Sequence, residues 1–302
     1  MNELIKKSDR LFLHKYDFFS IWKRILLDYF DEKIILNKMR CVNPKPWNDG
    51  PPLKIFVPSP NKIFIHHLIA ALAFQKGFIR LGRLEIYLAM RPYDYHRFTC
   101  DGSAGYKLYH ASSVLFQILF EKQFLCMLPR KDFIPWGKEL SAEKNTSYSK
   151  LINVDPDFMY LVKITPRKDL HEIVQGAENL KALWHFVRQC FSVRSNQVIP
   201  TLEKWIPGCG PRLIFNNLSI VTEFGELSPP EVLKLFQMFS QWPEYDHCPF
   251  LDSMDTYFLR SYIDHNPEEM HEEEFGNIDD EDSVADADLD GISGSAEKIE
   301  GI

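Results

Sequence analysis

The chain has 302 residues, of which 45% are hydrophobic and 14% aromatic, enough to build one large or two modest domains. No run of about 18 apolar residues occurs, so no segment is expected to span a membrane. The six cysteines form no C-x-x-C pair, which favours separate reduced thiols over a disulfide framework or a zinc site.

The net charge of −7 combines two regions of opposite charge. Residues 268–302 hold fourteen acidic residues and one basic residue, and subtracting these from the totals of 42 and 35 leaves 28 acidic and 34 basic residues over 1–267. This body, with a net charge of +6, suits a polyanionic partner, although the excess is modest. The acidic tail is expected to be disordered. The expected role of this tail is to keep the protein soluble. The alternative is that the tail competes with nucleic acid for binding to the basic body.

The first half of the chain predicts an α/β sheet. Helical periodicity is found at 10–30, 63–74 and about 109–120, and the proline-rich residues 43–52 predict a loop. Apolar runs of strand length lie at 54–57, 84–90, 124–128 and 158–164. Strands and helices alternate early, and the last two strands follow each other without a long helix, so we expect these two strands to be antiparallel. The helix at 63–74 is apolar all round and should be buried.

From about residue 167 the spacing of apolar residues becomes helical. Ser228 before Pro229-Pro230 predicts the start of one helix, and Trp242-Pro243 its end. The sequence therefore divides into an α/β part at 1–166, a helical part at 167–265 and the acidic tail at 266–302.

Two glycine motifs and a histidine pair are expected to have structural roles and not to bind a ligand. Residues 101–105 and 208–211 predict turns, because neither glycine motif stands between a strand and a helix as a phosphate-binding loop does. His66 and His67 are adjacent in the apolar helix and point about 100° apart, so a shared metal site is disfavoured.

Basic and aromatic residues alternate in the helical part, a pattern that suits phosphate contacts combined with base stacking. The alternative is a solvated helix face over an apolar core. The candidate nucleic-acid-binding residues are Arg188, Arg194, Lys204, Trp205 and Arg212.

Several motifs together resemble the rRNA adenine dimethyltransferase superfamily. The similar stretches are Leu81–Met90 (LGRLEIYLAM), Tyr109–Leu115 (YHASSVL), Leu128-Pro129 and Phe133–Trp136 (FIPW). The stretch Phe186–Ser195 resembles the start of the superfamily's helical C-terminal domain. Residues 227–243 resemble the ending of its fungal mitochondrial transcription factor B branch.

The resemblance implies a methyltransferase-type Rossmann-like sheet, lacking its first strands, followed by a small all-α domain. It implies that the chain begins after the second strand, so we expect an incomplete N-terminus or marginal stability. Members of the superfamily bind S-adenosylmethionine, and Asp17 matches the acidic residue that contacts its adenine. Ser59 falls at the fourth-strand motif in place of an asparagine, whose amide geometry a serine cannot reproduce. We therefore expect no methylation and no bound methyl donor.

The function implied by the resemblance is that of a mitochondrial transcription initiation factor. Its expected partners are mitochondrial RNA polymerase, single-stranded promoter DNA and RNA, with DNA held in a basic cleft between the α/β and helical parts. The first alternative is an S-adenosylmethionine-dependent rRNA adenine N6-dimethyltransferase. The second is a protein-interaction module that uses the acidic tail.

Overall fold

The computed structural model describes residues 42–58, 62–105, 108–133, 155 and 157–263. Asp17, Ser59, the expected helix at 10–30 and the acidic tail lie outside the described residues.

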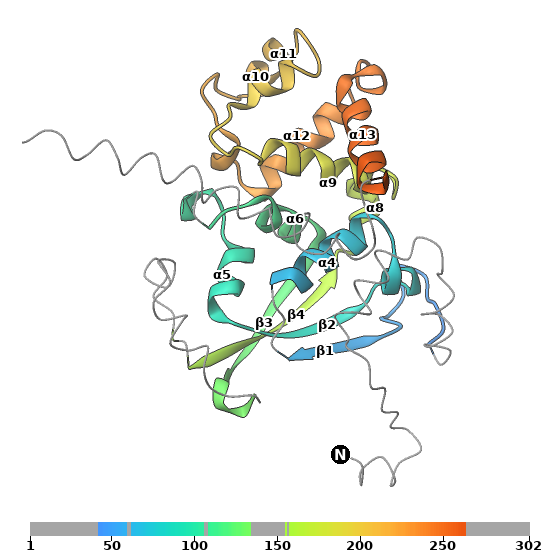
Figure 1. The fold of residues 1–302 in the computed structure, drawn as a ribbon, viewed down its shortest axis with the longest axis vertical. Helices are drawn as coiled ribbons and strands as arrows, with labels where there is room; N and C mark the ends of the chain where they lie inside the picture. The colour runs from blue at the N-terminus through green and yellow to red at the C-terminus, as the bar shows by residue number, and fades with distance from the viewer. Residues whose placement is uncertain (1–41, 59–61, 106–107, 134–154, 156, 264–302) are drawn as a thin grey trace, which may run out of the picture.

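A mixed four-stranded sheet forms one layer of the molecule (Figure 1). Its strands are β1 (Lys54–Pro58), β2 (Glu85–Met90), β3 (Phe120–Pro129) and β4 (Phe158–Pro166), in the order β1-β2-β4-β3. The first pair is parallel, and β4 is antiparallel to both β2 and β3. This confirms the predicted α/β class and the antiparallel final pair.

Alternation along β2 directs apolar side chains to the covered face of the sheet. Ile86 lies opposite Ile55 and Ile164 on its two neighbouring strands, and all three are buried. The covering helices are α4 (Lys62–Ala73), α5 (Pro92–Thr99) and α6 (Ala111–Leu119). Helix α4 is buried on all sides from Phe64 to Ala73, as its sequence predicted, and it contains the buried His66 and His67.

The helical part begins where β4 ends. Its helices are α8 (Leu170–Ile173), α9 (Asn179–Cys190), α10 (Val198–Glu203), α11 (Gly210–Phe215), α12 (Pro229–Ser240) and α13 (Pro249–Ile263). Helix α12 starts at the predicted cap, where the Ser228 N–H donates to the Glu231 carboxylate at 2.8 Å. Of the helices in the described residues, none is both long and apolar enough to cross a membrane.

Short 3-10 turns connect these elements. They are η1 (Gly77–Leu81), η2 (Gly102–Ala104), η3 (Arg130–Asp132), η5 (Phe224–Glu226) and η6 (Tyr245–His247). Both glycine motifs contain turns, as predicted: residues 101–105 contain η2, and Gly208 and Cys209 end the segment that connects α10 to α11, which begins at Gly210. In the second turn the Glu203 carboxylate accepts hydrogen bonds from the N–H groups of Gly208 and Gly210.

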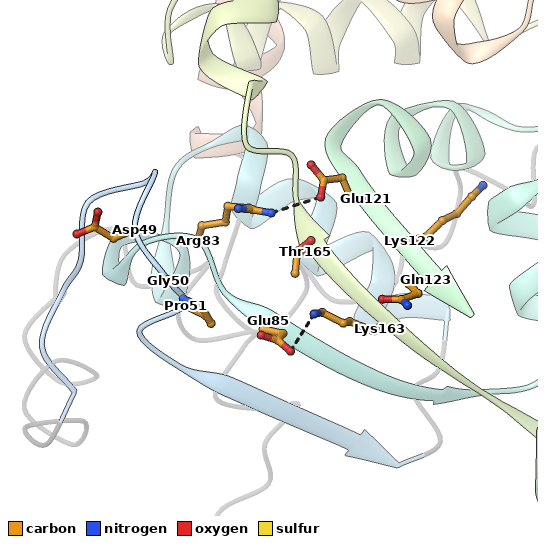
Figure 2. Close-up of a pocket in the computed structure, with 10 residues that line it drawn as sticks. All are labelled: Asp49, Gly50, Pro51, Arg83, Glu85, Glu121, Lys122, Gln123, Lys163 and Thr165. Carbon is orange, nitrogen blue, oxygen red and sulfur yellow. Dashed lines mark hydrogen bonds and ion pairs between the residues drawn. The ribbon is translucent and has the colours of Figure 1, made fainter. Parts of the chain in front are cut away.

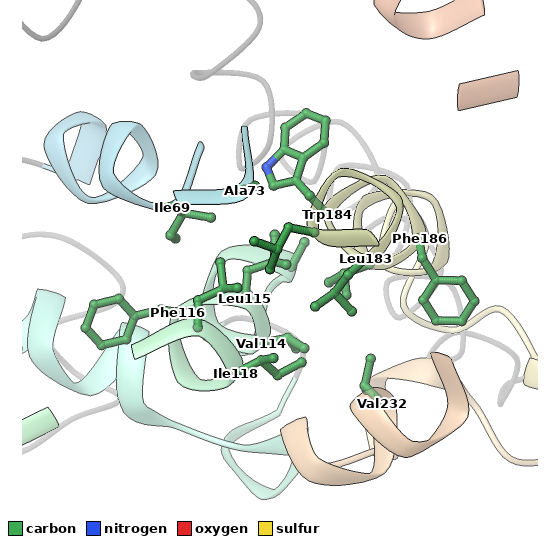
Figure 3. Close-up of a cluster of buried hydrophobic side chains, with 14 of the residues drawn as sticks. Ile69, Ala73, Val114, Leu115, Phe116, Ile118, Leu183, Trp184, Phe186 and Val232 are labelled. Carbon is green, nitrogen blue, oxygen red and sulfur yellow. The ribbon is translucent and has the colours of Figure 1, made fainter. Parts of the chain in front are cut away.

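One hydrophobic core joins the sheet side to the helical part. Figures 1 and 3 show α4 and α6 facing α9 and α12, with Val114 and Leu115 of α6 next to Leu183 of α9 and Val232 of α12. All four side chains are buried. Apolar side chains therefore fill the contact of α6 with α9 and α12, and the expected basic cleft is not seen there among the described residues.

Candidate nucleic-acid interface

Trp205, one of the five predicted nucleic-acid contacts, is half-buried and packs against aromatic side chains of the helical part. Its ring centre lies 4.9 Å from that of Phe250 and 5.6 Å from that of Phe239, and Phe186 is 5.9 Å away. These three phenylalanines are fully buried. The half-buried indole therefore contributes to the aromatic core, and its stacking on bases stays a prediction.

Arg194 is also a structural residue. Its side chain is buried, with 9% of the residue exposed, and its guanidinium donates to the Tyr109 carbonyl oxygen at 2.9 Å. The same nitrogen lies 3.2 Å from Nδ1 of His110. These contacts join the loop after α9 to the start of α6, so they replace the phosphate contact that the sequence favoured.

The three remaining basic candidates lie in different parts of the helical region and contact different residues. The Arg188 guanidinium lies 4.6 Å above the Trp184 ring and donates to the Tyr257 hydroxyl at 2.9 Å. Arg212 makes a bidentate pair with Glu244, at 2.6 and 2.9 Å. Lys204 is exposed at the end of α10. The five predicted residues thus contact different partners, and no shared site for them is seen in the described part of the chain.

A polar pocket of about 350 Å³ lies where β2 and β3 begin and β4 ends (Figure 2). Lys163 pairs with Glu85 at 3.1 Å, and Arg83 pairs with Glu121 at 3.3 Å. The hydrogen bond from the Tyr87 hydroxyl, followed by the contact with Lys163, lowers the pKa of Glu85 below its ordinary value. The charges in the pocket are therefore largely neutralised by one another.

The position of this pocket also argues against a ligand site. It lies at the amino ends of the parallel strands, since Arg83 and Glu85 are at the start of β2. Open α/β sheets bind ligands outside the carboxyl ends of their strands. A ligand is therefore expected at the opposite end of the sheet.

An aromatic cluster lies at that opposite end, beside the helix that follows β2. We call Tyr95 and His96 of α5, Phe124 of β3 and Tyr160 of β4 the aromatic platform. The Tyr160 ring centre lies 5.3 Å from that of Phe124, 5.5 Å from Tyr95 and 6.2 Å from His96. The rings meet edge to face, the geometry that aromatic pairs favour.

Local sequence positions α5 and hence the platform. Strand β2 ends at Met90, which lies opposite Tyr160 on β4, and Pro92 at the first helical position starts α5 directly. Arg91 pairs with the buried Asp94 carboxylate at 2.7 Å, which holds the first turn of the helix in place. Tyr95 follows Asp94 and contacts the ring of Tyr160.

The platform offers ring surface rather than charge. Phe124 is 44% exposed, and the other three rings are half-buried. Burial lowers the pKa of His96, so its ring is neutral at pH 7, and burial and Tyr160 raise the pKa of Tyr95. Proteins hold single-stranded nucleic acid without sequence preference by stacking bases on such rings. The platform is therefore our candidate nucleic-acid interface.

The sequence carries one signal for this platform. The segment Pro92–Phe98 (PYDYHRF) places several aromatic rings directly after a buried strand. Phe124 and Tyr160 are brought next to it only by the antiparallel pairing of β3 and β4, which sequence spacing does not reveal.

No family model matches the chain. It is 36% identical over 289 residues to the Drosophila melanogaster protein named dimethyladenosine transferase 2, mitochondrial, covering 83% of this chain and 64% of that protein. The mouse protein of the same name is 24% identical over 215 residues (68% of this chain, 54% of that protein). The human one is 26% identical over 165 residues (54% and 41%). The chain thus spans less than two thirds of the length of each of these relatives.

Two solved structures show a looser likeness. A dimethyladenosine transferase from Plasmodium falciparum matches with 14% identity and a TM-score of 0.42, over 64% of this chain and 70% of that one. The 23S rRNA methyltransferase ErmE matches with 14% identity and a TM-score of 0.37, over 64% and 68%. TM-scores this low do not establish a shared fold, so the relationship rests on the sequence similarity. That similarity supports a place for this chain in the rRNA adenine dimethylase superfamily.

Proposed function

We propose that this chain is a mitochondrial transcription initiation factor that binds single-stranded promoter DNA and assists mitochondrial RNA polymerase in promoter recognition and melting. The mitochondrial location is supported by the names of its relatives. These come from a fly and mammals, so the fungal branch remains a prediction from the motifs. The observation that carries the DNA-binding role is the aromatic platform beside the carboxyl end of β2.

Stacking energies indicate how much melted DNA such a platform could stabilise. Stacking a base on an aromatic side chain contributes about 1–3 kcal/mol. A step of DNA duplex costs about 1.4 kcal/mol to unstack. The ring centres lie 5.3–6.2 Å from that of Tyr160, so the rings pack against one another and only their outward surfaces could carry one or two bases. The platform would therefore stabilise a short melted segment, and it would act together with the polymerase rather than open promoters alone.

Electrostatics complete the proposal. The net charge of +6 over residues 1–267 attracts DNA without setting its register. The exposed Lys204 and the half-buried Arg188 remain proposed phosphate contacts, and so does Arg212 where DNA replaces Glu244 as its partner. Asp17 and Ser59 are the two residues matched to the superfamily's methyl-donor site. Both lie outside the described residues, so the proposal includes no bound methyl donor.

Run-off transcription from a closed and a pre-melted mitochondrial promoter tests the proposal. Adding this protein to the polymerase should increase transcription from the closed template, and the increase should be much smaller on the pre-melted one. Equal stimulation of both templates, or none, would contradict a melting role. Micromolar binding of S-adenosylmethionine together with rRNA methylation would favour the enzymatic alternative instead.

A further inference from the structure

Lys122 lies beside the aromatic platform, on the edge strand β3. It pairs in register with Ile164 of β4, and Phe124 pairs with Val162, so the side chains of Lys122 and Phe124 extend from the face of the sheet that carries the helices. Both side chains are exposed. Residues two apart on one face of a strand are separated by about 7 Å. A positive charge and an exposed ring therefore lie next to each other.

The Lys122 ammonium is held in place without being neutralised. Its Nζ donates to the Gln117 amide oxygen at 2.9 Å, and the Gln117 amide nitrogen donates to the Cys100 carbonyl at 2.5 Å, which orients the amide. Among the described residues no carboxylate lies within ion-pair distance of this Nζ. Glu121 pairs instead with Arg83 at 3.3 Å, and Figure 2 shows Lys122 pointing away from both. Because the amide is neutral and an ammonium has three N–H donors, Lys122 keeps its charge and two donors for a ligand.

Lys131 offers a contrast at the other end of β3. It lies in η3, directly after the strand, and is exposed. Asp132 follows it, and the Arg130 N–H donates to the Asp157 carbonyl at 2.8 Å, which brings the exposed Asp157 to the same turn. Two acidic residues thus offset the positive charge of this turn, so a phosphate would be attracted less strongly there.

Lys122 and the platform together match one chemical unit. The outward ring surface of Phe124 suits a base and the ammonium suits a phosphate, and a nucleotide joins the two through one sugar. An anionic membrane is recognised by clusters of about four to eight basic residues, whereas β3 contains a single basic residue. This juxtaposition therefore favours a single-stranded nucleic acid.

We propose that Lys122 binds the phosphate of the nucleotide whose base stacks on Phe124, an inference that rests on the proposed function above and adds a charged contact to the aromatic platform. Gln117 is a positioning residue, because it acts through the ammonium that it orients. Each phosphate contact on a single strand contributes about 0.7 to the slope of log affinity against log salt. Losing one contact therefore weakens binding about fivefold at 0.1 M salt, and the loss disappears towards 1 M.

The test titrates a fluorescein-labelled oligothymidylate of about 16 nucleotides with the full chain at several potassium chloride concentrations. We expect Lys122→Gln to reduce the slope by about 0.7 and to weaken binding about fivefold at 0.1 M salt. Lys131→Gln is the matched control and should bind as the wild type does, while Lys122→Arg keeps the charge and should retain the wild-type slope. All four proteins should have the same melting temperature, because both lysines are exposed.

An abasic oligonucleotide of the same length separates the phosphate contact from the base contact. Lys122→Gln should reduce the salt slope for this strand by the same amount as for oligothymidylate. Phe124→Leu, which weakens binding of oligothymidylate, should leave binding of the abasic strand unchanged, because that strand has no base to stack.

The outcomes separate the two proposals. A wild-type slope in Lys122→Gln, together with weaker binding in Phe124→Leu, overturns this inference and leaves the proposed function standing. Equal losses in Lys122→Gln and Lys131→Gln also overturn it, because they indicate a general attraction by net charge. If the wild-type chain does not bind the oligothymidylate, the proposed function fails as well.

Discussion

The guanidinium of Arg194 donates a hydrogen bond to the carbonyl oxygen of Tyr109, 2.9 Å away and 85 residues earlier in the chain. The Tyr109 hydroxyl donates in turn to the Leu227 carbonyl at 2.7 Å. Burial raises the pKa of Tyr109, so its hydroxyl remains a donor at neutral pH. Together these bonds connect the start of α6 to two separate segments of the helical part.

This arrangement predicts that Arg194→Ala acts on stability. The change leaves the buried Tyr109 carbonyl without a charged donor, so the free energy of unfolding should fall by about 2–3 kcal/mol. Urea denaturation measures the loss, and Lys204→Ala at an exposed position should stay within about 0.5 kcal/mol of wild type. A stable Arg194→Ala protein with a reduced salt dependence of DNA binding would restore Arg194 as a phosphate contact.

The aromatic platform predicts a loss of DNA affinity without a change in its salt dependence. Phe124→Leu keeps an apolar side chain of similar size but removes the ring, so single-stranded DNA should bind about tenfold more weakly. The slope of log affinity against log salt should stay the same, because no charge is removed. Lys204→Ala provides the contrast, since loss of a phosphate contact lowers the slope. Wild-type affinity in Phe124→Leu would rule out stacking at this ring.

Local signals were enough to predict much of the fold. Short apolar runs marked the four strands, the all-round apolar pattern marked α4 as buried, and Ser228 with Glu231 marked the start of α12. Each of these features depends on residues that are close in sequence. The last two strands could be predicted as antiparallel because no long helix separates them.

The candidate site could not be predicted in the same way. The sequence shows that Arg194 and Trp205 are basic and aromatic, but not that each faces inward. Arg194 is buried and bonded to Tyr109, and the half-buried Trp205 packs against phenylalanines as far along the chain as Phe250. Long-range pairing likewise assembles the aromatic platform. Charge and aromatic content therefore predicted nucleic acid as the ligand class. Which residues are free to contact a ligand is decided by tertiary contacts, which the sequence does not show.

Gly82 is predicted to be needed for the close packing of the loop before β1 against the residues that precede β2. It has a φ of 125°, and an added Cβ would lie 2.6 Å from the Lys45 carbonyl oxygen. The Lys45 N–H donates to the Leu81 carbonyl at 2.8 Å, so this loop cannot move away without losing a hydrogen bond. Gly82→Ala should cost about 1–3 kcal/mol of stability.

Gly50→Ala is the control for Gly82→Ala, because nothing lies within 4 Å of a Cβ added at Gly50. Its denaturation midpoint should match that of the wild type. If Gly82→Ala also unfolds at the wild-type midpoint, with the same dependence on denaturant, the contact between Gly82 and the loop does not contribute to stability.

His185 predicts a pH dependence of stability. It is 1% exposed on α9, and its Nε2 lies 3.2 Å from the Ser253 hydroxyl oxygen. Burial, and then the nearby Arg188, lower the pKa of His185 to about 4, from an ordinary value of 6.5. Between these two values the unfolded chain binds a proton that the folded chain does not bind. Stability from this group is therefore complete above pH 6.5 and is lost as the pH falls towards 4, by roughly 3 kcal/mol at most.

Unfolding free energies at pH 7 and pH 5.5 measure this effect above the range where most carboxylates titrate. His185→Gln keeps a nitrogen donor but cannot titrate, so it should lose less stability over this interval than wild type, even if it is less stable at pH 7. Ser253→Ala removes the hydrogen bond and leaves the histidine in place, so it should keep most of the wild-type pH dependence. Equal losses in wild type and His185→Gln would mean that the buried imidazole takes up its proton as readily in the folded protein as in the unfolded chain.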